Sequence, residues 1–186
     1  MRKIGHIIVA AIASLMTLSL VSCHVTKGAG TSRPKSGRGQ ATAITTIPNE
    51  WKSLSIDLGP GDNKRLYREV KSWLGVPYLY GGHSKDGADC SGFVMEVYKT
   101  VYGKNIQRNS AKIFQQNCRK INKDDLDEGD LVFFCTRATN TGDINHVGLY
   151  LKENKFVHAS SRGVVVADLN QNYWIAHWVA AGRVCR

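Results

Sequence analysis

Apolar residues recur with a helical period in the first half of the chain and with an alternating period in the second half. Over residues 63–74 they return every three or four positions, which predicts an amphipathic helix with Asp62 as its N-cap and Gly75 at its end. The same period predicts a second helix at about residues 90–102 and a short helix near residues 110–117.

The second half of the chain shows the alternation of apolar and polar residues that is typical of strands. Five strands are predicted, at residues 131–135, 144–151, 155–159, 164–167 and 178–184. Because helices precede a continuous series of strands, the sequence predicts an α+β fold in which a helical N-terminal half packs on an antiparallel sheet.

The N-terminus carries a third pattern, a continuous apolar run behind two basic residues. Residues 7–21 are too few to span a bilayer as a helix and are typical of a secretion signal. The sequence Leu-Val-Ser-Cys at residues 20–23 resembles the lipobox of bacterial lipoproteins, in which the cysteine is lipidated and becomes the first residue. We therefore expect a signal peptide at residues 1–22 and a lipid on Cys23, with a plain signal peptide or an uncleaved anchor as the alternatives.

The composition changes again after the predicted lipidation site. Residues 23–47 are rich in Gly, Ser, Thr, Lys and Arg and contain no acidic residue, so we expect a flexible basic tether. One domain is expected at residues 48–186, with ordinary globular composition. Of the net charge of +10, the signal carries +2 and the tether +4, which leaves +4 for the domain. This mild charge fits attraction to anionic envelope polymers as well as a solvated surface, and no nucleic-acid-binding motif accompanies it.

A lipid on Cys23 would attach the protein to a bacterial membrane in the cell envelope. His24 follows the cysteine, in place of the aspartate that retains lipoproteins in the inner membrane of enteric bacteria. In a bacterium with two membranes, the expected location is therefore the periplasmic face of the outer membrane.

Four cysteines remain in the predicted domain, and they are far apart in the sequence. An exported protein can form disulfides, but a domain of this size and composition does not require one. Cys118 and Cys135 are expected to be buried thiols, and a disulfide between Cys118 and Cys185 is an open alternative. The close ligand pairs of structural zinc sites are missing from the sequence, so no metal and no cofactor is expected.

Cys90 stands where a glycine-containing loop, residues 77–89, enters the second predicted helix. A helix N-terminus presents free amides and a positive dipole end, which favour a thiolate and can also face an oxyanion. Taken by itself, a cysteine in this position is also consistent with a buried, inert thiol. A nucleophilic cysteine requires a base and a residue that orients the base.

Two histidines on neighbouring predicted strands meet this requirement. In the strand at residues 144–151, His146 lies on the face opposite the main apolar residues. A short turn at residues 153–154 is expected to pair this strand with the one at residues 155–159, so that His158 becomes a hydrogen-bonded neighbour of His146. Each histidine taken separately is more often a packed or surface residue than a catalytic one.

Five segments resemble, in their order and spacing, the NlpC family of papain-like cell-wall cysteine peptidases. They are Pro-Tyr-Leu-Tyr-Gly-Gly at 77–82, Asp-Cys-Ser-Gly-Phe at 89–93, Gly-Asp-Leu-Val-Phe-Phe at 129–134, His-Val-Gly-Leu-Tyr at 146–150 and Phe-Val-His-Ala at 156–159. The resemblance covers about residues 63–183. It implies a papain-like fold with the nucleophile at a helix N-terminus packed on an antiparallel sheet.

The resemblance also implies roles for the matching residues. Cys90 matches the nucleophile of the family, His146 its general base and His158 the polar residue that orients the base. Tyr78 matches a tyrosine whose hydroxyl lies beside the nucleophile and contributes to oxyanion stabilisation. These four residues are the predicted catalytic residues.

Other positions of the resemblance leave alternatives open. Asp89 and Ser91 match positions of substrate contact, and a helix cap is an equal alternative for Asp89. Arg108 begins a segment that resembles an Arg-Thr-Ser motif, with Asn109 as the departure, and it is either a structural residue or a residue at the substrate edge. The polar residues 136–143 are expected to form a lid or a solvated loop.

The resemblance implies a hydrolase that cleaves an amide bond in peptidoglycan stem peptides through a cysteine acyl-enzyme. The usual bond in the family joins D-glutamate to the diamino acid, and some relatives cut crosslinks. The alternatives are a recycling dipeptidyl-peptidase that acts on freed stem peptides, an acyltransferase on a related scaffold, and a non-catalytic envelope-binding lipoprotein or zinc-binding protein. One catalytic domain behind a membrane tether favours the endopeptidase.

Overall fold

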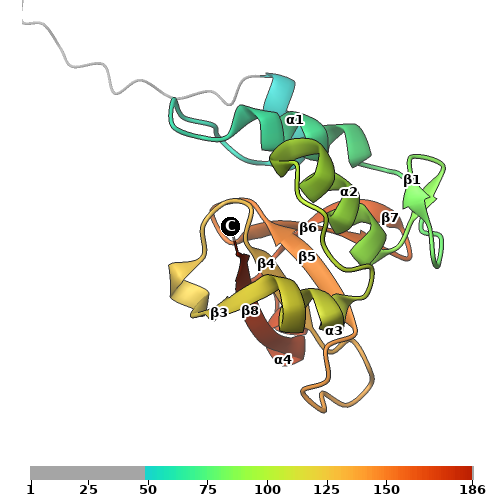
Figure 1. Ribbon diagram of the computed structural model, residues 1–186. Helices are drawn as coiled ribbons and strands as arrows, with labels where there is room; N and C mark the ends of the chain where they lie inside the picture. The colour runs from blue at the N-terminus through green and yellow to red at the C-terminus, as the bar shows by residue number, and fades with distance from the viewer. Residues whose placement is uncertain (1–48, 186) are drawn as a thin grey trace, which may run out of the picture. The chain divides into compact units, whose positions relative to one another are not determined.

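Two long helices cover one face of a six-stranded antiparallel sheet in residues 49–185, the part of the chain that the computed structural model describes (Figure 1). The helices are α1 (Lys64–Trp73) and α2 (Cys90–Tyr102), and most of the strands follow them in the sequence. This arrangement confirms the predicted α+β fold.

The start of α1 differs from its prediction. Asn63 is the N-cap, because its side-chain oxygen accepts a hydrogen bond from the Leu66 N–H at 3.2 Å. Asp62 instead accepts a hydrogen bond from the Gly59 N–H at 2.6 Å and pairs with the Lys152 ammonium at 2.9 Å. The prediction that Asp62 caps the helix is therefore wrong. Asp and Asn are both good N-cap residues. Lys152, which is distant in the sequence, pairs with Asp62, and Asn63 caps the helix.

Helix α2 has the predicted bounds. Gly103 ends it in the left-handed conformation, with a φ of 66°, which glycine adopts without a steric penalty. The short helix predicted near residues 110–117 is present as α3 (Ser110–Lys112), continued by a π-helical segment at Ile113–Asn117.

The sheet has the strand order β3-β8-β4-β5-β6-β7, with antiparallel neighbours throughout. Its strands are β3 (Cys118–Ile121), β4 (Leu131–Phe134), β5 (His146–Tyr150), β6 (Lys155–Ser160), β7 (Gly163–Asp168) and β8 (Trp178–Val184). The five predicted strands are confirmed. Strand β3 was not predicted, because its two exposed basic residues interrupt any apolar pattern and its pairing with β8 makes it an edge strand.

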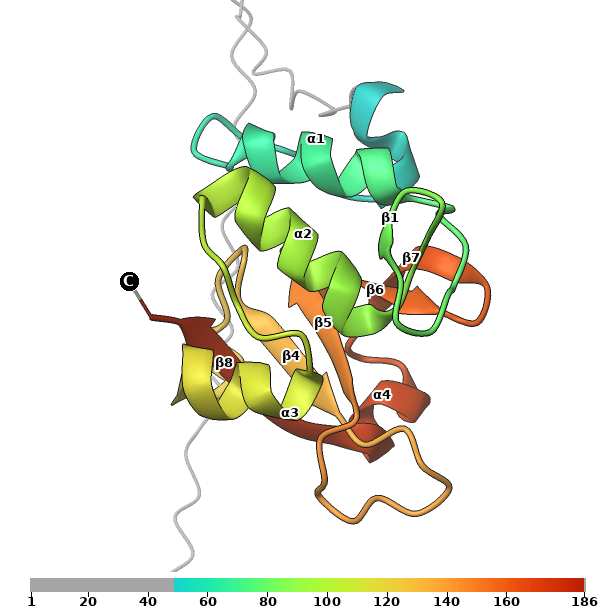
Figure 2. The same cartoon turned by 45° about the vertical axis from the view of Figure 1, so that its right-hand side comes forward.

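Several short elements complete the described chain. The loop before α2 contains a small hairpin of β1 (His83–Ser84) and β2 (Gly87–Ala88). Helix α4 (Asn172–His177) precedes β8, and 3-10 helices lie at Asn49–Leu54 and Lys123–Asp125. Figure 2 shows α4 beside the strands and away from α1 and α2.

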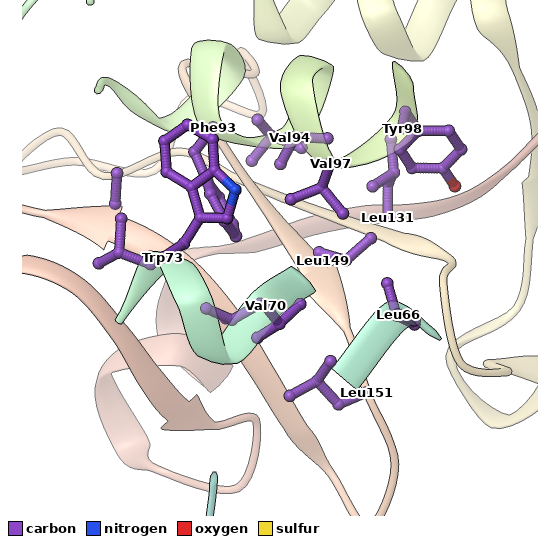
Figure 3. Close-up of a cluster of buried hydrophobic side chains, with 14 of the residues drawn as sticks. Leu66, Val70, Trp73, Phe93, Val94, Val97, Tyr98, Leu131, Leu149 and Leu151 are labelled. Atoms are coloured by element: carbon purple, nitrogen blue, oxygen red, sulfur yellow. The ribbon is translucent and has the colours of Figure 1, made fainter. Parts of the chain in front are cut away.

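Apolar side chains cover both faces of the sheet. Figure 3 shows the larger core, in which side chains of α1 and α2 meet Leu131, Leu149 and Leu151. The smaller core on the other face contains six fully or nearly buried residues: Val132, Phe134, Tyr150, Phe156, Leu169 and Trp174. The central strands therefore alternate between two buried faces, and the face that carries His146 is covered by α4.

The predictions for the N-terminal segment fall outside the residues that the structure describes. The predicted signal peptide, the lipidated Cys23 and the tether up to residue 47 lie outside them. Among residues 49–185, no helix has the length and hydropathy needed to cross a membrane.

The four cysteines of the described chain are free thiols. Cys135 is fully buried, as predicted, whereas Cys118 is partly buried and Cys185 is exposed. The disulfide between Cys118 and Cys185 that the sequence left open is therefore not formed.

Candidate active site

Helix α2 places Cys90 at its first position, and Asp89 fixes that start. The backbone of Asp89 is extended, and its Oδ1 accepts a hydrogen bond from the Gly92 N–H at 2.8 Å. This contact is the N-cap interaction that satisfies a free amide of the first helical turn. The cap that the sequence left open for Asp89 is thus present, and its contact with substrate stays a prediction.

A cluster of polar groups ties the start of α2 to the preceding loop. Arg108 Nη1 and Nη2 bind the two carboxylate oxygens of Asp89 at 2.6 and 2.8 Å, and Nη1 donates to the Ser91 Oγ at 2.7 Å. Nη2 also donates to the Gly82 carbonyl at 2.9 Å, and the Gly81 N–H donates to Asp89 at 2.9 Å. Such bidentate pairing fixes geometry, so Arg108 is a structural residue of this corner.

The cluster constrains most of the Asp-Cys-Ser-Gly motif. Burial disfavours the charged form of Asp89, but its hydrogen bonds, with those from Arg108 the largest, outweigh burial and lower its pKa. A Cβ atom at Gly92 would lie 2.2 Å from the Gly82 carbonyl oxygen, so a side chain there would displace the loop. Asp89, Ser91 and Gly92 therefore have structural reasons for their identity. The Cys90 side chain takes no part in this cluster.

The sulfur of Cys90 is partly buried and faces backbone N–H groups. Burial raises the pKa of the thiol, the Val147 N–H opposes that increase, and the Asp89 carboxylate adds to it. The N–H groups of Ser91 and Cys90 itself also oppose it, and the net direction is upward. The amides of the helix start act in the predicted direction and favour the thiolate, but burial has the larger effect on the pKa of Cys90. The raised pKa favours the protonated thiol, which a base would have to activate.

His146 and His158 are hydrogen-bonded neighbours, as predicted from the strand pattern. Nε2 of His146 and Nδ1 of His158 are 2.9 Å apart. The connection between β5 and β6 is a two-residue turn in which Glu153 and Asn154 have φ values of 54° and 59°, as in a type I′ hairpin. This turn sets the pairing of the two strands, which brings both imidazoles to the same face of the sheet.

The hydrogen bond also determines which nitrogen of His146 is available. When the Nε2–H of His146 donates to Nδ1 of His158, Nδ1 of His146 carries the free lone pair and can accept a proton. The Cys90 sulfur faces the N–H of Val147, the residue directly after His146. The candidate base and the candidate nucleophile therefore lie at the same end of β5.

Trp174 packs against both histidines and was not predicted as a site residue. Its ring lies 6.0 Å from the His146 ring at an interplanar angle of 18°, and 4.8 Å from the His158 ring at 78°. It is 7% exposed, so it holds the imidazoles in place and keeps water from that side. The aromatic residues at positions 173–178 were visible in the sequence, but only the position of α4 shows which ring reaches the histidines.

The two imidazoles are neutral at pH 7. Burial lowers the pKa of His146, and the Asp89 carboxylate opposes this effect without cancelling it. Burial also lowers the pKa of His158, and His146 and Arg162 add to that decrease. These shifts and the raised pKa of the Cys90 thiol act in the same direction, towards uncharged side chains.

The lowered histidine pKa values predict that the fold loses stability in mild acid. Below about pH 6.5 the unfolded chain protonates its histidines while the folded chain resists, so unfolding takes up protons and its free energy decreases as the pH falls. Between pH 7 and pH 5 we expect a decrease about 2 to 4 kcal/mol larger in the wild type than in a His146→Gln/His158→Gln variant, because both folded-state pKa values lie below 5. Urea unfolding at both pH values measures this, and equal decreases in the two proteins would contradict it.

A cleft of about 850 Å³ lies beside the histidines and is lined in part by Tyr78, His146, His158 and Trp174. Tyr78 is 43% exposed, and its backbone pairs with Ala88. Burial raises the pKa of Tyr78, and the proximity of Cys90 adds to this increase, so the hydroxyl stays protonated and can donate a hydrogen bond. The structure thus brings the four predicted catalytic residues together around one end of β5.

The other histidines near the motifs make contacts of their own. His83 is exposed and lies 3.4 Å from the Glu96 carboxylate, and Nδ1 of His177 lies 2.7 Å from the Tyr173 carbonyl. Within residues 49–185, no three His, Cys, Asp or Glu side chains are grouped as metal ligands would be.

The loop at residues 136–143, expected as a lid or a solvated loop, is anchored at several points. Asn145 Oδ1 accepts a hydrogen bond from the Thr136 N–H at 2.8 Å, and Arg137 pairs with Asp143 at 3.1 Å. Asn140 donates to the Ala176 carbonyl at 3.0 Å, which ties the loop to the end of α4. These contacts hold the loop beside the cleft that Thr136 helps to line.

Curated relatives resemble this chain over most of its length. Murein DD-endopeptidase MepS/Murein LD-carboxypeptidase of Escherichia coli K12 is 32% identical over 179 residues, which cover 95% of this chain and 90% of that protein. The probable endopeptidase NlpC of the same organism is 38% identical over 138 residues, or 74% of this chain and 85% of that protein.

Solved structures agree with this comparison. An NlpC/P60 family protein from Bacillus cereus matches with a TM-score of 0.60 and 31% identity, covering 66% of this chain and 40% of that chain. RipD of Mycobacterium tuberculosis matches with a TM-score of 0.54 and 20% identity, covering 66% of this chain and 96% of that chain, and supports the fold. RipD is described as a non-catalytic NlpC/p60 domain protein adapted to peptidoglycan binding.

The match to a family model includes the whole candidate site. The NlpC/P60 family model matches residues 75–183, which contain the loop before α2, the helix itself and the strands that carry both histidines. On this match, and on the relative that is 32% identical over 95% of this chain, the chain belongs to the NlpC/P60 family.

Proposed function

We propose that this protein is a peptidoglycan endopeptidase in which Cys90 is the nucleophile and His146 the general base. The observation that carries the proposal is the 2.9 Å contact between His146 Nε2 and His158 Nδ1, which leaves Nδ1 of His146 free at the end of β5 that faces Cys90. The name of the E. coli relative, a murein DD-endopeptidase, supports peptidoglycan as the substrate.

In the first half of the proposed reaction the peptide amide is broken. Nδ1 of His146 takes the proton of the Cys90 thiol while the sulfur forms a bond to the amide carbonyl carbon. The charge that develops on the carbonyl oxygen is stabilised by helix-start N–H groups of Cys90 and Ser91 and by the Tyr78 hydroxyl. The protonated His146 then gives its proton to the amine as the C–N bond breaks, which leaves a thioester on Cys90.

In the second half water releases the acyl group. His146 takes a proton from water, the oxygen attacks the thioester carbonyl carbon, and the C–S bond breaks as the sulfur recovers its proton. Throughout both halves, His158 accepts the hydrogen bond from Nε2–H of His146 and so keeps the same nitrogen directed at the reaction. The neutral resting pair is suited to this sequence, because each half begins with a proton transfer to a neutral imidazole.

The bond that we propose is an amide within or between stem peptides. The D-glutamyl-diamino acid bond and a crosslink bond both fit an amide-cleaving cysteine site. The designation DD-endopeptidase of the relative MepS favours a bond between two D-residues, as in a crosslink. A dipeptidyl-peptidase on freed stem peptides is the other enzyme of the same chemistry.

Digestion of purified peptidoglycan tests the function and the bond together. The protein is incubated with intact crosslinked sacculi and, separately, with isolated stem peptides, and the products are identified by mass spectrometry. Conversion of crosslinked fragments to monomers supports the DD bond, and truncated stems support the D-glutamyl bond. Cleavage of freed peptides only would indicate the recycling enzyme. Binding to sacculi without any cleavage would overturn the proposal in favour of a non-catalytic peptidoglycan-binding protein, as RipD is described.

We also propose the domain arrangement that the sequence suggests, with a signal peptide at residues 1–22, a lipid on Cys23, a tether to residue 47 and the catalytic domain at residues 48–186. The lipobox-like sequence at residues 20–23 supports a lipid anchor that holds the enzyme beside the wall. A location at the outer membrane, on its periplasmic face, follows from His24 in bacteria with two membranes.

Replacing Cys23 tests the anchor. We expect that the variant Cys23→Ala incorporates no radiolabelled fatty acid in cells and that the wild type does, because the thiol is the point of attachment. Cys185→Ala, which removes an exposed cysteine of the domain, is the matched control and should keep the label. Label that persists in Cys23→Ala would contradict the anchor without affecting the proposed reaction.

A further inference from the structure

The cleft beside the two histidines is lined by uncharged side chains, with Arg162 as the exception among the described residues. Its lining combines apolar groups with hydroxyls of Tyr78, Thr136 and Ser160 and the amide of Gln171. Among its described lining residues, Arg162 is the only Asp, Glu, Lys or Arg, and the histidines are neutral because burial lowers their pKa. At neutral pH the wall of the cleft therefore carries one positive charge and no negative charge.

The backbone that carries Arg162 is firmly held. Arg162 lies in the turn between β6 and β7, where Ser160 pairs with Gly163. The Ser160 Oγ accepts a hydrogen bond from the Arg162 N–H at 3.1 Å and donates to the Gly163 carbonyl at 2.9 Å. The neighbouring Val164 exchanges hydrogen bonds with the segment before Pro77, including one from its N–H to the Val76 carbonyl at 2.9 Å. These hydrogen bonds fix the backbone of the turn, from which the exposed Arg162 side chain extends.

The guanidinium of Arg162 makes no ion pair with any carboxylate of residues 49–185. Arg108, Arg137 and Arg183 form ion pairs with Asp89, Asp143 and Asp130, whereas Arg65, Arg68 and Arg119, which do not line the cleft, form none among residues 49–185. Arg162 is also close enough to His158 for its charge to act on that ring. The charge of Arg162 thus lies next to the proposed catalytic pair, on a rigid turn, and no carboxylate of residues 49–185 neutralises it. Such a charge can bind an anionic group of the ligand.

The ligand group that fits is a carboxylate. Guanidinium forms two parallel hydrogen bonds with a carboxylate, and these charge-assisted bonds are about twice as strong as neutral ones. A carboxamide can accept a hydrogen bond but brings no charge, so the site should distinguish the two. The described residues that line the cleft include no Asp or Glu that could compete with a ligand carboxylate for Arg162.

We propose that Arg162 is a specificity-determining residue that binds a carboxylate of the peptide substrate close to the amide that is cleaved. The assignment rests on the proposed function and narrows its substrate to acidic peptides with a free carboxylate at that position. Amidation of this carboxylate then weakens binding without changing the bond that is broken.

Binding to an inactive variant tests this assignment independently of catalysis. Three forms of one synthetic stem peptide are titrated into full-length Cys90→Ala by calorimetry: unmodified, amidated at the D-glutamyl carboxylate, and amidated at the C-terminus. We expect one of the two amidations to weaken binding about tenfold or more, as the loss of a charge-assisted contact does. In Cys90→Ala/Arg162→Gln, the unmodified peptide should bind about as weakly as that amide, and the preference should disappear.

Arg119 provides the matched control, since it is an exposed arginine on β3, at the edge of the sheet opposite to β7. Arg119→Gln in the same inactive background should leave all three affinities unchanged. Arg162→Lys should keep part of the preference, because it retains the charge but not the planar fork. With the active enzyme, Arg162→Gln should raise KM for the unmodified peptide more than it lowers kcat.

The outcomes separate the two proposals. A preference for the free carboxylate that survives in Arg162→Gln overturns the role of Arg162, whether or not the enzyme cleaves peptidoglycan. Equal binding of all three peptides by the wild-type cleft overturns it as well. If the peptides bind with the expected preference but the active protein cleaves none of them, the proposed function fails and the carboxylate site stands.

Discussion

Replacing Cys90 with alanine is expected to reduce peptidoglycan cleavage by about 10⁴-fold or more, because the acyl-enzyme has no other sulfur to form on. The sulfur lies at the first position of α2 among backbone N–H groups, and the other members of its motif have structural contacts instead. The rate of release of soluble fragments from sacculi measures the effect.

A stability measurement and a control variant distinguish loss of the nucleophile from loss of the fold. The side chain of Cys90 lies outside the Asp89–Arg108 cluster, so Cys90→Ala should retain the melting temperature of the wild type within a few degrees. Cys185→Ala, at an exposed cysteine, should retain full activity. A Cys90→Ala protein that keeps more than a tenth of the wild-type rate would remove Cys90 from the mechanism.

Replacing His146 with alanine is expected to reduce cleavage by about 10²- to 10⁴-fold, the usual contribution of a general base. Burial raises the pKa of the Cys90 thiol, so the thiolate does not form readily without a base. The same variant should therefore also react more slowly with iodoacetamide at pH 7, which reports on the thiolate in the absence of substrate.

His83 is the matched control for this experiment. Its side chain is 58% exposed and contacts Glu96, so His83→Ala should change neither cleavage nor alkylation. Loss of cleavage with unchanged alkylation in His146→Ala would show that the helix start, and not His146, activates the thiol. Unchanged cleavage would exclude His146 as the base altogether.

The neutral pair of Cys90 and His146 has a physical origin that no sequence motif contains. The helix start was expected to favour a thiolate, and its amides do act in that direction. The same amides belong to a site that is covered by β5 and, on the histidine side, by Trp174. Burial disfavours the charged forms of both groups, and for the Cys90 pKa its effect is larger than the opposing effect of the amides.

Most of the fold followed from periodicity, and the exceptions have local causes. The helical and alternating periods predicted α1, α2 and five strands because each of these elements presents a continuous apolar face to a core. Strand β3 escaped prediction because it is an edge strand with two exposed basic residues. The cap of α1 was misassigned because Asp62 and Asn63 are equally good caps, and Lys152 engages the first of them.

The candidate site divides in the same way. Local signals, a helix start and a two-residue hairpin, placed Cys90, His146 and His158, and the family resemblance singled them out. Arg108, Trp174 and Arg162 come from other segments, and neither their spacing nor their composition indicates what they touch. Their contacts with Asp89, the imidazoles and the cleft arise only in the folded chain.

By itself the sequence determined the order of the main helices and strands and the family resemblance, and it indicated Cys90 and His146 as the candidate nucleophile and base. Only the tertiary structure decided that Asp89 caps α2 and binds Arg108, that both imidazoles are neutral, and that one arginine provides the charge of the cleft. The reason is physical: periodicity and motif spacing act between neighbours along the chain, whereas burial, protonation and ion pairing depend on which distant segments exclude water from a given group.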